Sequence, residues 1–195
     1  MAGSDLTTPV LLMAMPQVLD PFFHHSVVLL LHHEDEGSFG FIVNRPTGIK
    51  VSEILQGMDV DWQGREEAVA YFGGPVQPQL GTVLFAPVLV DSSPDDTATE
   101  VVPGVALTQH VGDLSRLAEA PPDHFRLLLG YAGWGQGQLM EEILRNDWLT
   151  APVSGDLIFA PDPEQVWDAA LRSVGIDPVA LPSWIPSGAP EESTN

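Results

Sequence analysis

The chain has 195 residues, of which 44% are hydrophobic, and this is enough apolar material for one domain of ordinary size. It contains no cysteine, which excludes thiolate nucleophiles, CxxC redox pairs and cysteine-based zinc sites. With 27 acidic and 7 basic residues, the formal charge of -20 opposes direct nucleic-acid binding, which depends on cationic side chains. We expect this charge mainly to keep the protein soluble, with a specific basic partner as the alternative.

The first apolar run, residues 10–15, is short, has no lysine or arginine before it and ends at Pro16. A signal peptide carries a basic segment ahead of its apolar segment, so this run is not typical of one. No run approaches the roughly 20 apolar residues of a membrane span. We therefore expect a cytoplasmic protein that makes no contact with a membrane.

Residues 27–31 and 39–43 are β-prone runs on either side of a polar, glycine-containing loop. This pattern predicts a β-hairpin. Ser52 is predicted to cap a short helix that reaches Leu55. Further strands are predicted at 68–72, 82–85, 100–102 and 105–108, with an exposed acidic loop at 91–97.

In the second half, the apolar spacing predicts helices at 110–118 and 138–145 and a buried strand at 125–129. Asp162 and Pro163 are typical of the start of a helix, and Gly175 of its end. Together the elements indicate an α+β fold with a mixed, mainly antiparallel sheet. We expect a single domain over 1–185 and a disordered tail over 186–195, where Pro, Ser and Glu are frequent.

A glycine-rich loop is predicted at 130–137, between a strand and a helix. In that position backbone N–H groups and a helix N-terminus can hold an anion. The spacing is weak evidence, because Gln138 stands where a dinucleotide fingerprint needs its third glycine. The alternative, which we favour, is that the glycines permit a tight turn while Tyr131 and Trp134 fill the core.

Four histidines, His24, His25, His32 and His33, raise the question of a metal site. If they lie along one strand, neighbours point to opposite faces, and same-face pairs are about 26 Å apart. Such pairs cannot share one ion. We therefore expect structural or surface roles for these histidines, and neither a metal nor a cofactor.

No catalytic signature stands out. The sequence lacks the GxSxG and SxxK patterns of serine enzymes. Acid–base chemistry by Glu141, Glu142 or Asp147 is conceivable, but Glu141 and Arg145 have the spacing of an ordinary ion pair on a helix surface. We favour a solvated helix face for these carboxylates.

Asn44 and Arg45 follow a predicted strand and precede Pro46. The guanidinium of Arg45 could bind a carboxylate or phosphate through two hydrogen bonds. The favoured alternative is that Asn44 forms a turn and Arg45 pairs with one of the many acids. A turn is likewise favoured over a ligand contact for the glycine pair that ends at Gly74.

Four segments occur in a recognisable order: MPQVLDPFFHHSVVLLLHH, NRP, GGPV and LGYAGWGQGQLMEEILRNDWLT. Through them, from about Leu11 to Asp177, the chain resembles the AlgH/YqgE-like family of bacterial proteins. The resemblance implies a complex sheet folded toward a pseudo-barrel with helices packed outside. It implies no reaction, although the names of some members suggest regulators of exopolysaccharide genes.

The sequence departs from this family at polar positions. Members usually carry Glu-His where this chain has His32 and His33, and Glu at the position of Met140. They also carry Arg and His after the GGP turn, where this chain has Leu80 and Phe85. A catalytic or ligand site built from those groups would be lost or rebuilt here, so no catalytic assignment is transferred.

We therefore predict a non-enzymatic, cytosolic binding or regulatory protein whose partner is an unknown small molecule or protein, with an indirect effect on transcription as one route. The alternative is a small-molecule binder or an enzyme that uses a cleft near the glycine-rich loop. Direct DNA binding is the third hypothesis, and the charge opposes it. The ligand-binding candidates are Asn44, Arg45, Gly74, Tyr131, Trp134 and Gln138.

Overall fold

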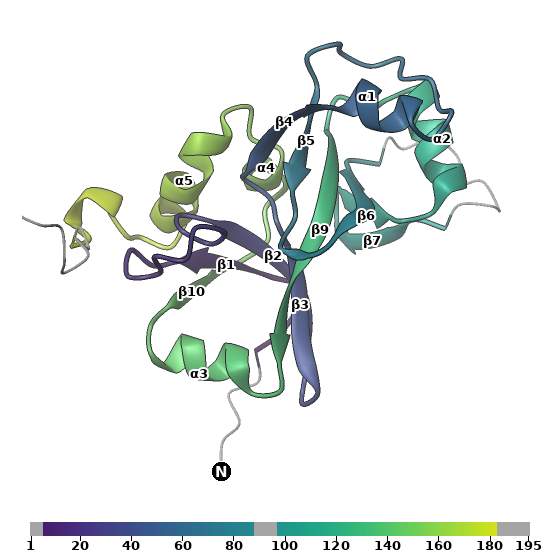
Figure 1. The fold of residues 1–195 in the computed structure, drawn as a ribbon. Helices are drawn as coiled ribbons and strands as arrows, with labels where there is room; N and C mark the ends of the chain where they lie inside the picture. The colour runs from purple at the N-terminus through teal and green to yellow at the C-terminus, as the bar shows by residue number, and fades with distance from the viewer. Residues whose placement is uncertain (1–5, 88–96, 183–195) are drawn as a thin grey trace, which may run out of the picture.

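The computed structural model describes residues 6–87 and 97–182, and within them ten strands form one curled sheet with helices on its outside (Figure 1). The strands are β1 (Val10–Ala14), β2 (Val27–Glu34), β3 (Gly37–Ile42), β4 (Pro46–Lys50), β5 (Val69–Phe72), β6 (Val76–Phe85), β7 (Thr99–Val102), β8 (Val105–Thr108), β9 (Phe125–Gly135) and β10 (Trp148–Ala151). The helices are α1 (Val51–Gln56), α2 (Val111–Glu119), α3 (Gln138–Leu144), α4 (Gly155–Ile158) and α5 (Val166–Ser173). Short 3-10 helices lie at Pro163–Gln165 and Pro178–Ala180. The predicted α+β class is confirmed.

The sheet is mainly antiparallel, as predicted. Its path is β10-β1-β2-β3-β9-β6-β8-β7, with β4 and β5 beside it. Among the described strands, β5 and β9 form the one parallel pair. No helix in the described ranges is long and apolar enough to cross a membrane.

The long strand β9 corrects the prediction of a loop at 130–137. The strand continues through the glycines to Gly135, pairing Gly133 with Phe39 and Gly135 with Gly37 of β3. The backbone that was considered as an anion cradle, the less favoured alternative, is therefore part of the sheet, and the favoured tight turn is also absent up to Gly135. Only the turn residues before α3 lie outside the strand.

Three glycines let backbones cross in contact where β5 ends and β6 begins. A Cβ atom at Gly74 would lie 2.0 Å from the carbonyl carbon of Tyr131, and one at Gly73 would lie 2.3 Å from the oxygen of Gly130. Gly130 also has a φ of 70°, a left-handed conformation that favours glycine. The GGPV and LGYAG segments therefore encode a close chain crossing.

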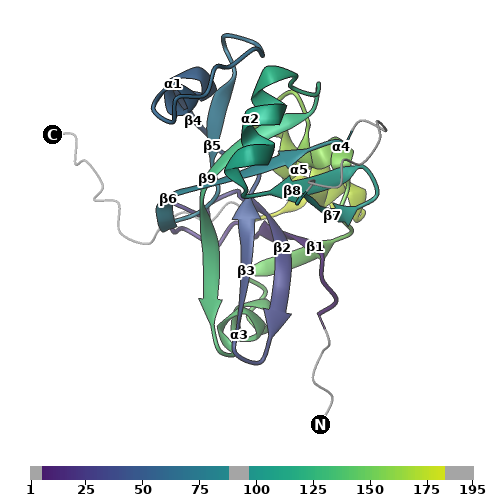
Figure 2. The same ribbon diagram turned by 90° about the vertical axis from the view of Figure 1, so that its right-hand side faces the viewer.

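Three apolar clusters fill the fold, and each lies between the sheet and a different set of helices. Figures 1 and 2 show where these helices lie around the sheet. Helices α4 and α5 pack on one face of β1 and β2, and α3 packs on the other. Helices α1 and α2 cover the far end of β6 and β9. Trp167 of α5 donates its indole N–H to the carbonyl of Ala14 at 2.7 Å, which ties α5 to β1.

The predicted hairpin is confirmed, but its strands are longer than expected and leave only a short turn between β2 and β3. His32 and His33 consequently lie on β2. Strands β1 and β10 were not predicted. Residues Leu11 and Leu12 of β1 are fully buried on opposite faces, which explains why that run is apolar without alternation.

The predicted helix ends had mixed outcomes. Asp162 accepts a hydrogen bond from the N–H of Glu164 at 3.0 Å, so the cap before α5 is confirmed. Ser52, in contrast, lies inside α1, whose N-cap residue is Lys50, with no side-chain cap. The tail at 186–195 and nearly all of the acidic stretch at 91–97 lie outside the described residues.

The glycine crossing yields a stability prediction. We expect Gly74→Ala to lower the free energy of unfolding by about 4 kcal/mol or more, because its Cβ would meet the Tyr131 backbone. Gly133→Ala is the matched control on the same strand system, since its Cβ would make ordinary contacts at 3.5 Å or more. It should change stability by less than about 1 kcal/mol. Urea denaturation of both variants measures this, and equal losses would contradict a tight crossing.

Candidate functional site

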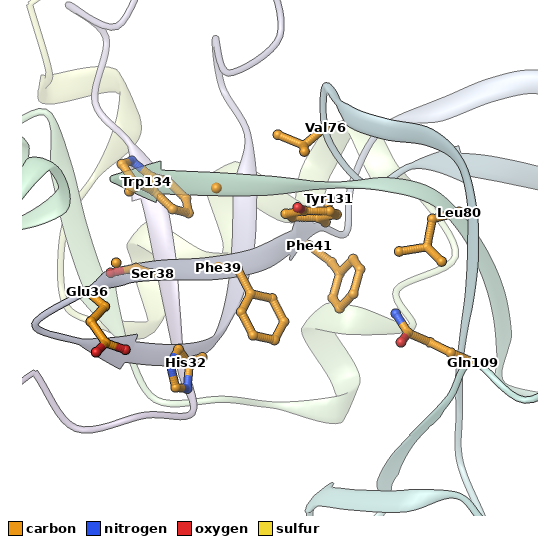
Figure 3. Close-up of a pocket in the computed structure, with 12 residues that line it drawn as sticks. His32, Glu36, Ser38, Phe39, Phe41, Val76, Leu80, Gln109, Tyr131 and Trp134 are labelled. Atoms are coloured by element: carbon orange, nitrogen blue, oxygen red, sulfur yellow. The ribbon is translucent and has the colours of Figure 1, made fainter. Parts of the chain in front are cut away.

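A cavity of about 580 Å³, lined by several aromatic rings, lies on the face of β3 and β9, and we call it the aromatic groove (Figure 3). It crosses from β2 through β3 and β9 to β6. Its lining residues are His32, Glu36, Gly37, Ser38, Phe39, Phe41, Val76, Leu80, Gln109, Tyr131, Gly133 and Trp134.

Phe39 is the centre of the groove wall. Its ring lies 6.2 Å from the ring of Tyr131 in an edge arrangement and 5.6 Å from His32 in a stacked one. The residue is nevertheless 39% exposed, so much of its apolar surface faces solvent. On β9 the cross-strand neighbour is Gly133, which has no side chain to fill the space. The groove is therefore open because a glycine faces an aromatic residue.

The two ends of the groove are polar. Figure 3 shows His32 and Glu36 together at one end and Gln109 at the other. His32 also lies 3.7 Å from Glu34, while Gln109 donates its amide N–H to Thr82 at 2.8 Å. The groove thus combines ring surfaces in the middle with carboxylates at one end. This combination suits a ring that carries a cationic or neutral donor group.

A serine–histidine contact borders the groove. Ser38 Oγ lies 2.7 Å from His33 Nδ1, and the two residues are direct cross-strand partners. Nucleophilic serines use such a contact, with a third group that orients the base. Among the described residues His33 forms no ion pair with a carboxylate. The arrangement is that of a cross-strand hydrogen bond within the β2–β3 pair.

Asn44 and Arg45 hold the turn ahead of β2. Asn44 accepts from the N–H of Val27 at 2.8 Å and donates to the carbonyl of His25 at 3.0 Å. Arg45 donates to the carbonyls of Pro21 and His24 at 2.9 and 2.5 Å. The expected pairing of Arg45 with an acid is therefore wrong, because the carbonyls of this turn occupy its guanidinium. Burial lowers the pKa of Arg45.

These two residues line a second cavity, of about 680 Å³, beside stacked rings. The His25 ring lies 4.0 Å from that of His24 and 4.1 Å from that of Trp167. His24 and His25 precede β2, so the assumption that they point to opposite faces of a strand is wrong. His25 has a left-handed backbone conformation, with a φ of 54°. The pKa of His25 is lowered, first by its partial burial and second by the charge of the neighbouring His24.

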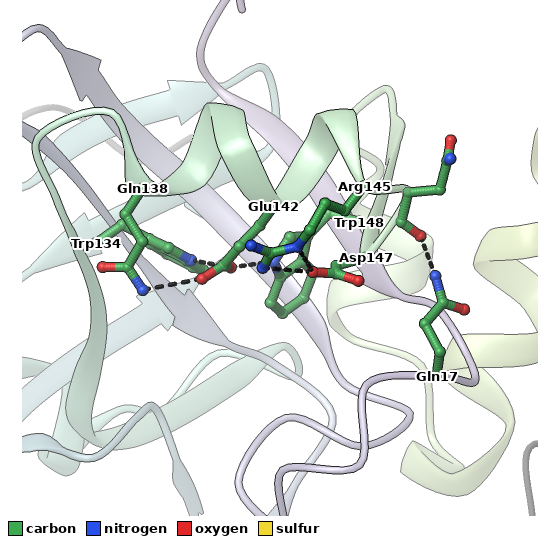
Figure 4. A network of polar contacts seen from close by, with 8 residues as sticks. Gln17, Trp134, Gln138, Glu142, Arg145, Asp147 and Trp148 are labelled. Carbon is green, nitrogen blue, oxygen red and sulfur yellow. Dashed lines mark hydrogen bonds and ion pairs between the residues drawn. The ribbon is translucent and has the colours of Figure 1, made fainter.

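Trp134 and Gln138 belong to a network around Glu142 (Figure 4). Glu142 accepts the indole N–H groups of Trp134 and Trp148 at 2.9 and 2.7 Å and an amide N–H of Gln138 at 2.9 Å. Gln138 in turn accepts from the N–H of Gly135 at 3.0 Å. These bonds fasten α3 to β9 and β10.

Glu142 is therefore not merely a carboxylate on a solvated helix face. The predicted ion pair between Glu141 and Arg145 is wrong. Arg145 instead pairs with Asp147, with 2.8 Å between Nη2 and Oδ2.

The six candidate residues are distributed over separate places. Tyr131 and Trp134 line the aromatic groove, while Asn44 and Arg45 line the second cavity. Gly74 is buried at the chain crossing, and Gln138 belongs to the Glu142 network. Neither the aromatic groove nor the second cavity contains all six.

The sequence hypotheses missed most of the groove, including Phe39, Gln109 and the role of Gly133. Phe39 and Phe41 alternate along β3, which was the available signal for one shared face. Leu80 makes one wall of the groove apolar. Phe85 instead belongs to the core and is 8% exposed.

Comparisons with known proteins agree with this fold. The family model described as AlgH-like matches residues 11–179. A UPF0301 protein of Myxococcus xanthus is 38% identical over 174 residues, which cover 89% of this chain and 93% of the relative. The solution structure of AlgH from Pseudomonas aeruginosa is 32% identical with a TM-score of 0.70, covering 91% of this chain and 94% of that one. A crystal structure from Corynebacterium diphtheriae, 24% identical with a TM-score of 0.71, covers 88% of this chain and 89% of that one and shows the fold alone.

The Glu142 network predicts a mutational effect. Glu142→Ala should lower the free energy of unfolding by about 2–4 kcal/mol, because it leaves the indole N–H groups of Trp134 and Trp148 without their acceptor. Glu141→Ala is the adjacent control, since Glu141 is exposed, and should change stability by less than about 0.5 kcal/mol. Urea titrations followed by circular dichroism give both values. Indistinguishable losses would show that the network contributes nothing.

The ring stack predicts a pH dependence. Because the pKa of His25 is lowered from the ordinary 6.5, the unfolded chain takes up this proton first as the pH falls. The free energy of unfolding should therefore decrease from pH 6.5 down to the folded-state pKa of His25. His25→Asn, which tolerates the left-handed backbone, should remove this component. Parallel stability curves for the two proteins between pH 7.5 and pH 5 would refute the assignment.

Proposed function

Because this chain belongs to the AlgH-like family of bacterial proteins, we propose that it is a cytoplasmic, non-enzymatic binding protein whose aromatic groove holds a small ring-bearing molecule. The observation that carries the proposal is the exposed Phe39 ring beside the open position at Gly133. An exposed aromatic surface in a concave site is the usual lining of a small-molecule pocket. A bound ligand would then change the affinity of this protein for a regulatory protein partner.

The charges of the groove narrow the class of ligand. Glu34 and Glu36 stand at the His32 end, in a chain whose formal charge is -20. A phosphate or carboxylate at this end would be repelled. A ring with an amine is attracted both by these carboxylates and by the faces of Phe39 and Tyr131. The proposed ligand is therefore a ring compound that carries an alkylammonium group, or a neutral heteroaromatic compound.

The polar contacts at the site support binding without catalysis. Ser38 is 7% exposed and already bonded to His33, and that histidine has no carboxylate partner in the described part of the chain. A hydrolase is the second candidate, and the Ser38–His33 contact is the observation that favours it. Covalent labelling of Ser38 by a fluorophosphonate probe would favour the hydrolase over the binding protein.

The same charge supports an indirect role in regulation. Duplex binding requires cationic side chains that displace counterions from phosphates, and this chain has only 7 basic residues. An effect on transcription would therefore pass through a protein partner. The partner's recognition of the ligand-bound groove is part of the proposal.

The test uses a pair of indoles that differ in charge. Tryptamine carries an ammonium group and should produce saturable amide chemical-shift changes at Phe39 and Gly133, while indole-3-acetate should bind at least about tenfold more weakly. Gly133→Val should fill the groove, because a Cβ at this position already lies 3.5 Å from the Tyr131 ring. It should abolish the shifts.

Phe39→Ala removes the groove wall and should weaken tryptamine binding by about tenfold or more. Phe22→Ala is the matched control, since Phe22 is 47% exposed and stacks on Phe72 outside the groove. It should leave the dissociation constant unchanged. Tryptamine shifts that persist in Gly133→Val, or equal effects of the two phenylalanine variants, would reject the groove as the binding site.

A further inference from the structure

A separate cavity of about 220 Å³ lies at the opposite end of β9 from the aromatic groove, between β5 and the segment that follows α4. Its lining includes Tyr71, His124, Arg126 and Phe159. Neither the family resemblance nor the groove accounts for it. Arg126 is the feature that distinguishes it from the other cavities.

Arg126 is a buried cation that lacks a carboxylate. It is only 6% exposed, and its Nε and Nη2 atoms donate to the carbonyls of Ile158 and Ala160, both at 2.6 Å. Its guanidinium carbon lies 4.1 Å from the centre of the Tyr71 ring. Among the described residues, no aspartate or glutamate forms an ion pair with it.

This arrangement costs free energy that a counter-ion would recover. Two of the five guanidinium N–H groups are used by the two carbonyls, and these neutral acceptors do not cancel the positive charge. Burial accordingly lowers the pKa of Arg126, and Tyr71 acts in the opposite direction. The chain has 27 acidic residues, yet none is placed as the partner of this group in the described structure.

The other charged groups at the cavity lie at its exposed rim. Arg65 and His124 are the further cationic or titratable groups, and Glu67 and Asp123 are the acids. Charges at such exposed positions are screened by solvent, whereas the buried guanidinium is not. With His124 neutral, the rim carries one positive and two negative charges, and the buried positive charge of the cavity is that of Arg126 alone.

We propose that this cavity binds a small organic monocarboxylate, with its carboxylate on Arg126 and its planar body against Tyr71 and Phe159. A guanidinium matches a carboxylate through two parallel hydrogen bonds. The ring of Phe159, stacked with His124 at 5.1 Å, supplies an apolar wall. The volume limits the ligand to the size of a single ring. This site is independent of the aromatic groove, so either proposal can fail alone.

The test titrates the full chain with benzoate and with benzamide, its neutral isostere. Benzoate should raise the melting temperature and move the Nε–Hε resonance of Arg126 in a saturable way, and benzamide should do neither. Inorganic phosphate is the third probe. Equal binding of benzamide, or tighter binding of phosphate than of benzoate, would overturn the monocarboxylate assignment.

Variants separate the site from the fold. Arg126→Gln should weaken benzoate binding by about tenfold or more, but it also loses bonds to the α4 segment. Arg65→Ala changes an exposed rim residue and should weaken binding by about threefold. Arg172→Ala is the control, because this arginine pairs with Asp168 away from the cavity. Equal benzoate affinity of wild type and Arg65→Ala, with an unmoved Arg126 resonance, would refute the proposal.

Discussion

The structure depends on the contact between backbones at Gly73, Gly74 and Gly130. Because these three residues carry no Cβ atom, β5 and the start of β6 can lie directly against β9. That contact lets one strand of eleven residues belong to both halves of the curled sheet. The groove and the Arg126 cavity are consequences, since each lies where β9 meets a different set of neighbours.

Most polar side chains that looked available in the sequence are used to hold the fold. Arg45 binds the carbonyls of a turn, and Glu142 collects two indole N–H groups. The groups that line the aromatic groove and the Arg126 cavity are of another kind: ring faces at Phe39 and Tyr131, and one buried guanidinium at Arg126. In the two sites that we propose, these groups recognise the shape and the charge of a ligand.

The sequence predicted the elements whose signals are local. The β2–β3 hairpin follows from two apolar runs, and the start of α5 from Asp162 and Pro163. The predicted strand at 125–129 is shorter than β9, because glycines usually weaken strands. Here the glycine-containing part of β9 is stabilised by pairing with β3, which is distant in the sequence. The groove could not be assembled from the sequence, since Phe39, Gln109 and Gly133 lie on different parts of the chain and meet through strand register.

The position of β1 constrains how the chain is made. This early strand lies between β2 and β10, and the carbonyl of Ala14 accepts a bond from Trp167, 153 residues later in the chain. During synthesis β1 and β2 emerge from the ribosome long before β10 and α5. One edge of β1, with its buried leucines, therefore stays unpaired until β10 has been synthesised, and until then that edge is open to pairing with other chains.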